Sequence, residues 1–500
     1  MSDDVFDILI IGGGINGTAI ARDASGAGLS VVLCERDDLA QHTSSSSTKL
    51  IHGGLRYLEY YEFRLVREAL KEREVLLRSA PHIIWPMRFV LPYDEGLRPA
   101  WMLRLGLLIY DNIGGRKMLP GTETVQLNDA DHKNVLQERL KFGYEYSDCW
   151  VEDSRLVVLN ALDAQTKGAK IFRSAEVKNI STVQAGYSAE IHHGDGRIQT
   201  ITARAIVNSA GPWVDSILKG IKPDYEKPAL RLVKGSHIVT KKLFDGEHAY
   251  IFQNDDNRII FAIPYEHHYT LIGTTDVPYS HEEGPVKISQ DEIDYLCEAA
   301  SEYFANEITS DDVQWTYSGV RPLYDDRSDD ASAVTRDYVL DIEEFAPDAP
   351  FMSIYGGKIT TSRKLAEHAM EKLSPFLGVE HEPWTAEAHL PGGDIPDADF
   401  DDFFEKLSRK YPWLEAGVLH RLTRSYGTKI HDILGKAQDE EGLGQDFGAG
   451  LYESEVRYLI ENEWVEEADD VIWRRTKLGI HMNADEIQGL TDWFKQQNIG

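Results

Sequence analysis

The stretch VFDILIIGGGINGTAIARDASGAG, residues 5–28, decides the fold. An apolar run, Val5–Ile11, leads into a turn with Gly12, Gly14 and Gly17, and a helix of small residues follows. In such a turn the first glycine bends the chain, the second lets the backbone approach a pyrophosphate, and the third lets helix and strand pack closely. The stretch therefore predicts strand, turn and helix, with the helix N-terminus facing the phosphates of a dinucleotide.

An acidic residue stands at the end of the next predicted strand. That strand covers residues 30–33, and Glu35 follows 18 positions after Gly17, close to the spacing at which a carboxylate meets a ribose hydroxyl. A lone GxGxxG pattern is weak evidence by itself. Together with a strand before it, a helix after it and an acid at this distance, it indicates dinucleotide binding.

The chain beyond residue 40 does not continue as a nicotinamide-binding domain would. It enters the polar loop HTSSSSTKLIHGGLRYLE at 42–59, followed by a predicted helix at 62–80, and no parallel strand is evident until 169–177. Hydroxyls and backbone amides in such a loop suit the face of a cofactor, where bulky side chains would exclude the ring. A solvated polar loop is the alternative interpretation of the serines.

Two later strands also run into small residues. Residues 204–210 lead into the sequence AGPW, and residues 350–355 lead into GGK and a further helix. Ordinary strand-to-helix turns explain each junction singly. The set of three, scattered over the chain, is typical of flavoproteins in which a substrate domain is inserted into the nucleotide-binding domain.

The composition limits the class of protein. The chain has 500 residues, 42% of them hydrophobic, which favours two or three globular domains. Its formal net charge of −31 repels nucleic acid and anionic lipid at long range, so nucleic acid is excluded as a partner. Three widely spaced cysteines indicate neither a disulfide framework nor a metal site, and the reducing cytosol fits best. No secretory signal and no run of 18 apolar residues is present, so we expect neither export nor a membrane span.

Several longer motifs, in order along residues 8–483, carry a resemblance to a known family. They include TSSSSTKLIHGGLRYLEYYEFRLVREAL, NSAGPWVD, KGSHIV, IGTTDV, YSGVRPL, YGGKITTSRKLAEHA and ADDVIWRRTKLG. The chain resembles the FAD-dependent, quinone-linked aerobic glycerol-3-phosphate dehydrogenases. The resemblance implies oxidation of sn-glycerol 3-phosphate to dihydroxyacetone phosphate, with electrons passed through FAD to a membrane quinone. It also implies peripheral contact with the cytoplasmic face of the cell membrane, and homodimer formation stays open.

The expected FAD contacts come from the three junctions, the end of the second strand, the serine loop and the strand at 169–177. They are Gly12, Gly14, Ile15, Asn16, Gly17, Glu35, Arg36, Thr43, Ser44, Ser45, Ser46, Ser47, Lys49, Leu50, Gly53, Gly54, Val177, Ala210, Gly211, Trp213, Gly357, Lys358 and Thr360.

A dianionic phosphate held without metal favours arginine, whose forked guanidinium makes paired charge-assisted hydrogen bonds. Arg56 and Arg321 are the candidate phosphate ligands, although a salt bridge from Arg321 to Asp325 or Asp326 would explain that residue structurally. The resemblance implies that His237 also lines the substrate pocket. Thr274 and Thr275 are further candidate contacts, although their hydroxyls could simply belong to a turn.

Oxidation of a secondary alcohol needs a base for the hydroxyl proton, and histidine is the natural candidate. His237 is the first choice and His52 the second, although either could be a core histidine. A cation such as Arg321 or Lys358 would stabilise the developing alkoxide. The sequence has no metal-binding motif, so no metal is expected.

Two further segments have a recognisable character. PAWMLRLGLLIYDNIGGRK, residues 99–117, mixes apolar and basic residues as an interfacial helix does, although a core helix would explain it too. Beyond Pro391 the chain predicts a separate helical domain, with Val456, Leu459, Ile460 and Trp464 in its core.

The predicted class is α/β, or α+β overall. A Rossmann-like FAD-binding domain is expected at 1–70, 150–228 and 341–378, a substrate or cap region with an antiparallel sheet at 71–149 and 229–340, and helices at 379–500. The alternatives are a glycerol-3-phosphate oxidase that uses oxygen, another FAD-dependent amine or hydroxy-acid oxidoreductase, and a flavin-binding protein without enzymatic activity.

Overall fold

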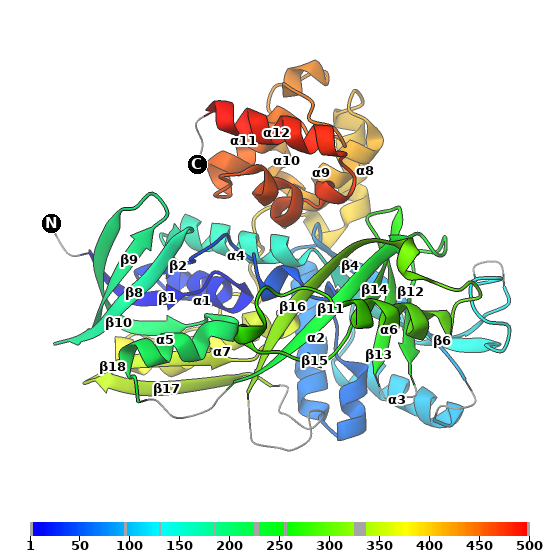
Figure 1. Cartoon of the computed structure of the whole chain (residues 1–500), viewed down its shortest axis with the longest axis horizontal. Helices are drawn as coiled ribbons and strands as arrows, with labels where there is room; N and C mark the ends of the chain where they lie inside the picture. Colours follow the sequence, from blue (N-terminus) through cyan, green and yellow to red (C-terminus); the bar gives the residue numbers. More distant parts are fainter. Residues whose placement is uncertain are drawn as a thin grey trace.

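The computed structural model describes residues 4–94, 98–129, 132–184, 186–224, 230–254, 256, 258–324 and 337–497. Two β-sheets lie side by side, and a domain made of helices sits over them (Figure 1). The predicted α/β class with a C-terminal helical domain is confirmed.

The first sheet joins strands that are far apart in the sequence. They are β1 (Asp4–Ile11), β2 (Val31–Cys34), β7 (Lys170–Phe172), β8 (Ala175–Val183), β9 (Gly186–His193), β10 (Ile198–Asn208), β17 (Val339–Ala346) and β18 (Ala349–Tyr355). The order is β17-β18-β10-β1-β2-β7, and the strands from β18 to β7 are parallel. The centre of β1 is buried on both faces, as its continuous apolar run requires.

Three helices cover one face of this sheet. They are α1 (Ile15–Gly26), α4 (Asp153–Thr166) and α7 (Ser362–Leu377), and their apolar side chains share one core with the sheet. On the other face, α5 (Val214–Ile221) packs with β8 and β9. The parallel strands therefore direct their carboxyl ends to one edge, where ligands bind in open α/β sheets.

The second sheet contains, in the described residues, β3 (Leu50–Ile51), β4 (Ile84–Pro92), β5 (Glu123–Gln126), β6 (Phe142–Val151), β11 (Leu230–Lys241), β12 (Ala249–Gln253), β13 (Ile259–Tyr265), β14 (Tyr269–Gly273), β15 (Val277–Pro278) and β16 (Val313–Tyr324). Its pairs are antiparallel except β4 with β12. The sequence analysis found no parallel strand before residue 169, so β4, which pairs in parallel with β12, was missed. Around it lie α2 (Phe63–Ser79), α3 (Ala100–Ile113) and α6 (Gln290–Ser301).

The predicted strand at 169–177 was wrong in one respect. The segment forms two strands, β7 and β8, which are interrupted at Arg173 and Ser174. Ser174 has a positive φ of 47°, which extended strands do not adopt. The chain turns there, and β8 pairs with β9 instead of continuing beside β2.

The C-terminal helices are α8 (Phe400–Lys410), α9 (Ala416–Tyr426), α10 (Ile430–Leu434), α11 (Glu453–Asn462) and α12 (Ala484–Gln497), with a short π-helix at Asp470–Arg475. Val456 and Leu459 lie in their common core, and Ile460 packs against it, as predicted. The prediction for Trp464 was wrong: this residue packs against the cores next to the first sheet. It follows the end of α11 with a positive φ, so its side chain leaves the direction of that helix.

Helix α3 is amphipathic. Leu107 and Tyr110 are buried and Leu103 packs on the same core, whereas Trp101, Met102, Leu105 and Leu108 are exposed. Within the described part of the chain, none of the helices combines the length and the apolar character needed to cross a membrane.

Candidate active site

The three glycine junctions meet at one crevice. A cavity of about 180 Å³ is lined by the ends of β1, β10 and β18, including Gly12, Gly14, Ala210, Gly211 and Gly357. These residues come from segments separated by more than a hundred positions, and the parallel strands bring them to the same edge.

Glycine is required at two of these positions. Gly12 has φ of +109°, and a Cβ there would lie 2.6 Å from the carbonyl oxygen of Ser209. A Cβ on Gly17 would lie 2.0 Å from the oxygen of Gly12, so helix α1 could not pack as closely on the turn. Gly17 therefore shapes the crevice without lining it.

The segment after β2 forms one wall of the crevice. The Glu35 carboxylate accepts hydrogen bonds from the amides of Gly13 (2.7 Å) and Asp37 (2.9 Å). Burial raises the pKa of Glu35, while those two amide donors oppose the shift. The Arg36 guanidinium lies over the ring of Trp213, 4.0 Å from its centroid, and Val177 lines the crevice near them.

The serine loop connects this crevice to a larger cavity. Ser44 Oγ accepts a hydrogen bond from the amide of Ile15 (3.0 Å), at the start of α1, and Thr43 donates to the carbonyl of Val320 (2.7 Å). Both residues line both cavities, whereas Ser46 and Ser47 line only the larger one.

Five predicted cofactor residues line neither cavity: Gly17, Ser45, Lys49, Gly53 and Gly54. Lys49 Nζ is buried and donates to both oxygens of Asp153 (2.8 and 2.9 Å) and to the carbonyl of Ser45 (3.1 Å). It therefore fixes the serine loop to the start of α4. A Cβ on Gly53 would meet Leu70, so that glycine allows close packing of α2.

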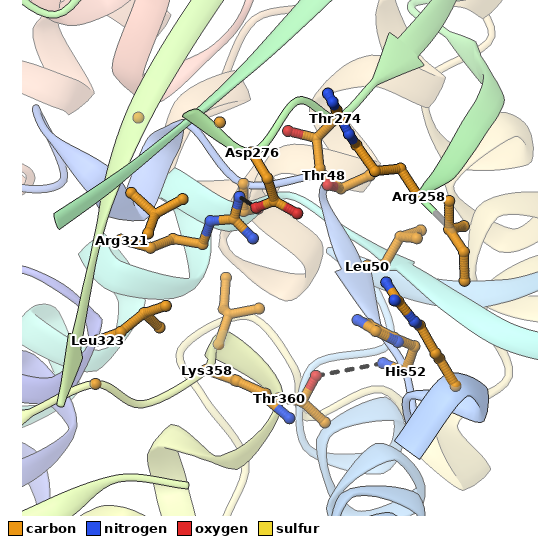
Figure 2. A pocket seen from close by; sticks show the side chains of 18 of the residues that line it. Thr48, Leu50, His52, Arg258, Thr274, Asp276, Arg321, Leu323, Lys358 and Thr360 are labelled. Carbon is orange, nitrogen blue, oxygen red and sulfur yellow. Dashed lines mark hydrogen bonds and ion pairs between the residues drawn. The ribbon is translucent and has the colours of Figure 1, made fainter. Parts of the chain in front are cut away.

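The larger cavity has a volume of about 1020 Å³ and lies between the two sheets. In the described residues, six basic side chains line it against four acidic ones, so its wall is basic in a strongly acidic chain. Arg258, Arg321 and Lys358 are labelled in Figure 2 with their neighbours. The basic residues are Arg56, Arg98, Arg231, Arg258, Arg321 and Lys358.

Arg321 and Lys358 lie on different sides of this cavity (Figure 2). Arg321 is paired with Asp276 and also donates to the carbonyl of Thr275 (3.1 Å). The alternative partners Asp325 and Asp326 lie outside the described residues. Lys358 Nζ lies over the ring of Tyr57, 3.8 Å from its centroid.

Of the other predicted substrate contacts, Arg56 and Thr274 line the large cavity and Thr275 does not. Arg56 lines the cavity and donates to the hydroxyl of Tyr60 (3.2 Å). Thr274 lines it as well. Thr275 does not, because its buried hydroxyl donates to Glu292 (2.8 Å) and accepts from the amide of Ser236 (2.9 Å).

His237 lines the cavity from β11 and is almost fully buried. Its Nε2 lies 3.0 Å from the hydroxyl of Thr48, and its ring stacks on Tyr317 at 4.6 Å. Among the described residues Nδ1 has no hydrogen-bond partner. Burial, with the charges of Lys49 and Arg321, lowers the pKa of His237 to about 3, so the ring is neutral near pH 7.

His52 is neutral for a similar reason but differs in its hydrogen bonds. Burial and the charge of Lys358 lower its pKa to about 4. Its Nδ1 accepts from the amide of Gly54 (3.1 Å), so the proton of the neutral ring is on Nε2. Its own amide donates to the hydroxyl of Thr360 (3.3 Å). This arrangement suits a hydrogen-bond donor better than a base.

Two family models match the chain. Residues 7–342 match the family of FAD dependent oxidoreductases, and residues 383–491 match the C-terminal domain of alpha-glycerophosphate oxidase. The aerobic glycerol-3-phosphate dehydrogenase of Escherichia coli is 47% identical over 99% of this chain and 98% of its own. The chain belongs to the FAD-dependent glycerol-3-phosphate dehydrogenase family.

Other relatives agree with this membership. The D-erythritol 1-phosphate dehydrogenase of Brucella abortus is 50% identical over 99% of this chain and 98% of its own. The glycerol-3-phosphate dehydrogenase of Bacillus halodurans, solved with FAD, has a TM-score of 0.76 at 27% identity and covers 99% of this chain and 95% of its own. This glycerol-3-phosphate dehydrogenase family member is therefore an FAD-dependent oxidoreductase.

The residues at the crevice fit FAD. The backbone at Gly12 leaves no room for a side chain, and the buried Asn16 Oδ1 has no partner in the described part of the chain. A glycine-rich turn at a helix N-terminus suits a pyrophosphate, because the backbone can approach the phosphates closely and the free amides of the helix can donate to them. The adjoining large cavity shares Ile15, Ser44 and Gly357 with the crevice, so one extended molecule can occupy both.

Sequence reasoning missed several residues of the larger cavity. Thr48, Tyr57, Arg98, Arg231 and Arg258 all line it. Tyr57 and Thr48 stood within quoted motifs without an assigned role, and Arg231 is the second residue of β11, a strand rich in basic and apolar residues. An isolated arginine in an acidic chain was the signal available for Arg98 and Arg258, but it gives no direction in space.

Proposed function

We propose that this enzyme oxidises sn-glycerol 3-phosphate to dihydroxyacetone phosphate and passes the electrons to a membrane quinone. The observation that carries the proposal is the basic wall of the large cavity beside the nucleotide crevice. A phosphate dianion gains most where several cations converge, and a chain of net charge −31 would otherwise repel it.

Arg321 and Arg56 are the proposed phosphate ligands. Arg321 is held by Asp276 and the Thr275 carbonyl, which fixes the direction of its guanidinium. That group still has donors to offer, because a guanidinium carries five N–H bonds. Lys358 lies next to the junction with the crevice, because the preceding Gly357 lines both cavities, and His52 and His237 line the same large cavity as the two arginines.

His237 is the proposed base. Its neutral ring can accept the proton of the hydroxyl on carbon 2, while the Thr48 hydroxyl and the Tyr317 ring hold the imidazole in place. Lys358 and His52 Nε2–H are the proposed donors that stabilise the developing alkoxide. When bound, FAD accepts the hydrogen of carbon 2 with its electron pair, so the carbonyl forms as both bonds break.

Anaerobic addition of glycerol 3-phosphate to the yellow protein tests the proposal directly. The visible flavin band should bleach, and a quinone analogue should restore it. Unchanged absorbance would contradict the proposal. Fast recovery with oxygen, with peroxide formed and poor quinone reduction, would instead identify a glycerol-3-phosphate oxidase, and bleaching by an amine or hydroxy acid alone would identify another oxidoreductase.

A second candidate substrate is a longer polyol phosphate. A relative at 50% identity is named for D-erythritol 1-phosphate, and the cavity carries polar groups beyond the proposed phosphate ligands, among them Gln253 and Asn254. Hydroxyls of a fourth carbon would need such partners. The ratio of kcat/KM for the two phosphates decides between them: a higher value with D-erythritol 1-phosphate would replace the first assignment.

Quinone reduction requires contact with lipid, and we propose α3 as the contacting element at the cytoplasmic face of the cell membrane. The support is the exposed apolar face formed by Trp101, Met102, Leu105 and Leu108, with Arg104 exposed among them. An aromatic residue, leucines and a basic residue on one exposed helix are typical of interfacial binding.

A further inference from the structure

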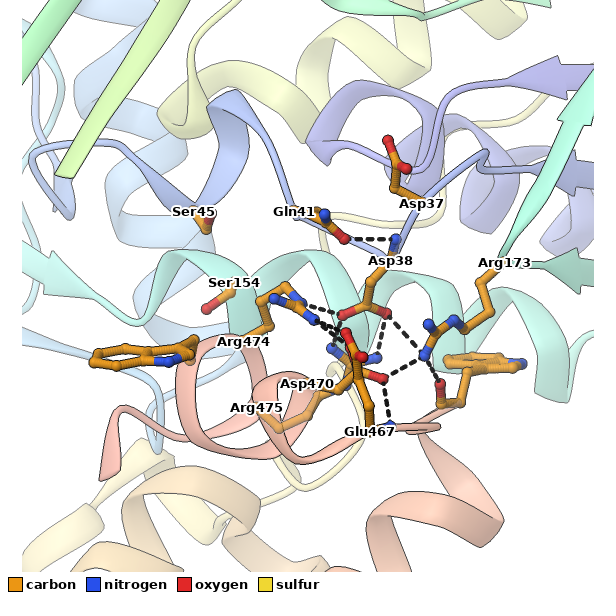
Figure 3. Close-up of polar contacts among 12 residues, drawn as sticks. Asp37, Asp38, Gln41, Ser45, Ser154, Arg173, Glu467, Asp470, Arg474 and Arg475 are labelled. Carbon is orange, nitrogen blue, oxygen red and sulfur yellow. Dashed lines mark hydrogen bonds and ion pairs between the residues drawn. The ribbon is translucent and has the colours of Figure 1, made fainter. Parts of the chain in front are cut away.

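A buried ion-pair network joins the C-terminal domain to the wall of the nucleotide crevice (Figure 3). At its centre is Asp38, whose side chain is 1% exposed. Its carboxylate accepts hydrogen bonds from Arg475 Nη1 (2.8 Å) and Nη2 (2.9 Å) and from Arg474 Nε (2.6 Å). Both arginines belong to the π-helix of the C-terminal domain.

The network is almost balanced in charge. Arg173, beside β7, reaches Asp38 at 3.7 Å and Asp470 at 2.5 Å, and Arg474 also pairs with Asp470. Arg475 donates to the backbone carbonyl of Glu463 (2.7 Å) as well. Burial would raise the pKa of Asp38, but Arg475, Arg474 and Arg173 outweigh it and lower that pKa below its ordinary value. Asp38 is therefore a carboxylate held by oriented guanidinium groups.

Asp38 does not line the crevice, but its neighbours do. Glu35, Arg36, Ala40, Gln41 and His42 are all lining residues. The Asp38 amide donates to Gln41 Oε1 (3.0 Å), and the Gln41 amide donates to the Asp38 carbonyl (3.2 Å). On the side of the segment that faces the glycine turn, the Ala40 amide donates a hydrogen bond to the carbonyl of Gly13 (3.3 Å). The segment 35–42 is thus an irregular turn that is tied to the glycine turn on one side and to the arginines on the other.

Such a turn has little intrinsic preference for one shape, because residues 36–42 belong to no strand or helix. The positions of Arg36 and Gln41 depend on where Asp38 is held. We propose that Arg475 is a positioning residue for FAD: from the C-terminal domain it holds Asp38, and thereby keeps the 35–42 turn in the shape that binds the nucleotide. The inference rests on the proposed placement of FAD in the crevice.

The C-terminal domain is then part of the machinery for retaining the cofactor, although none of its described residues lines the crevice. A purely structural role predicts something different, namely that weakening Arg475 loosens the whole protein without a specific effect on FAD. An arginine–carboxylate ion pair elsewhere in the C-terminal domain serves as a control that distinguishes the positioning role from the purely structural role. Arg421 binds Glu455 through two hydrogen bonds of 2.7 Å, and neither residue lines the crevice or contacts Asp38 through a hydrogen bond or ion pair.

The experiment compares Arg475→Lys with Arg421→Lys in the full-length chain. Each variant keeps the charge and loses the forked contact. Apoprotein is titrated with FAD, and the dissociation constant is read from flavin fluorescence; the melting temperature of each apoprotein is measured alongside. We expect a roughly tenfold or larger rise in that constant for Arg475→Lys, as for other residues that orient binding groups, and little change for Arg421→Lys. Equal constants in the two variants would overturn the proposal.

A second variant approaches the same pair from the other side. Asp38→Asn keeps the shape of the side chain and removes its charge, so it should also weaken FAD binding. The double variant Asp38→Asn/Arg475→Lys should bind FAD about as weakly as the worse single variant, because both remove one interaction. Fully additive losses would contradict the pairing.

Hydrogen exchange on the unmodified protein gives a test that needs no variant. Coupling between two sites is reciprocal, so FAD binding should slow amide exchange at 470–478 as well as at 35–42. Protection confined to the crevice would overturn the inference. None of these readouts uses glycerol 3-phosphate, so a different substrate would leave them unaffected.

Discussion

The exposed face of α3 makes a quantitative prediction about lipid binding. Leu105 and Leu108 are 48% and 58% exposed. Full burial of a leucine side chain away from water is favourable by about 1.5–3 kcal/mol. Insertion of the exposed half of each leucine into the lipid therefore contributes roughly 1 kcal/mol to the free energy of membrane binding. The double variant Leu105→Glu/Leu108→Glu should lose about 2 kcal/mol of lipid affinity, which corresponds to a roughly 30-fold weaker partition into vesicles.

Co-sedimentation with phosphatidylcholine vesicles measures this change without a contribution from anionic headgroups. The matched control is Val183→Glu/Ile198→Glu, which adds the same charge at two other exposed apolar residues, on β8 and β10. The control should bind like the unmodified protein. Undiminished binding of the α3 variant, or an equal loss in the control, would refute the assignment of this helix as the contact.

Three further predictions concern the cavity and the buried histidines. Arg321→Lys should raise KM for glycerol 3-phosphate about tenfold or more, since the forked contact is lost; an unchanged KM in steady-state assays would exclude Arg321 as a phosphate ligand. His237→Gln should lower kcat by about 10²–10⁴-fold while the FAD content of the purified protein stays constant, and near-normal turnover would exclude His237 as the base. The free energy of unfolding in urea should fall as the pH falls from 6.5 toward 4. Burial lowers the native pKa of His82 and His237 to about 3 and that of His52 to about 4, so the unfolded chain takes up protons that the native protein does not. His82→Leu should reduce that slope by roughly 1.4 kcal/mol per pH unit, and an identical slope would contradict the buried neutral state of this ring.

The parts of the fold that sequence predicted are those with short-range patterns. The apolar run before Gly12, the small residues of α1 and the glycines after β18 each limit their own local structure, because few other residues fit a turn with a positive φ or a close backbone approach. Their convergence on one crevice then follows from parallel pairing.

The parts of the fold and of the site that the sequence did not predict depend on contacts between segments that are distant along the chain. Lys49 is adjacent to the serines in sequence, yet it points to Asp153, more than a hundred residues away. Trp464 fits a helical period but follows a residue where the helix has ended. The larger cavity takes Arg231 and Arg321 from two strands of the second sheet and Arg258 from the residue before β13, and only the tertiary arrangement brings them to one cavity.

The order of the strands in the first sheet has a consequence for biosynthesis. β1 pairs with β10, and β10 with β18, so the nucleotide crevice is incomplete until residue 357 has left the ribosome. If Arg475 is needed as well, a nascent chain cannot retain its flavin before residue 475 has been translated. Products truncated before that residue should then accumulate colourless.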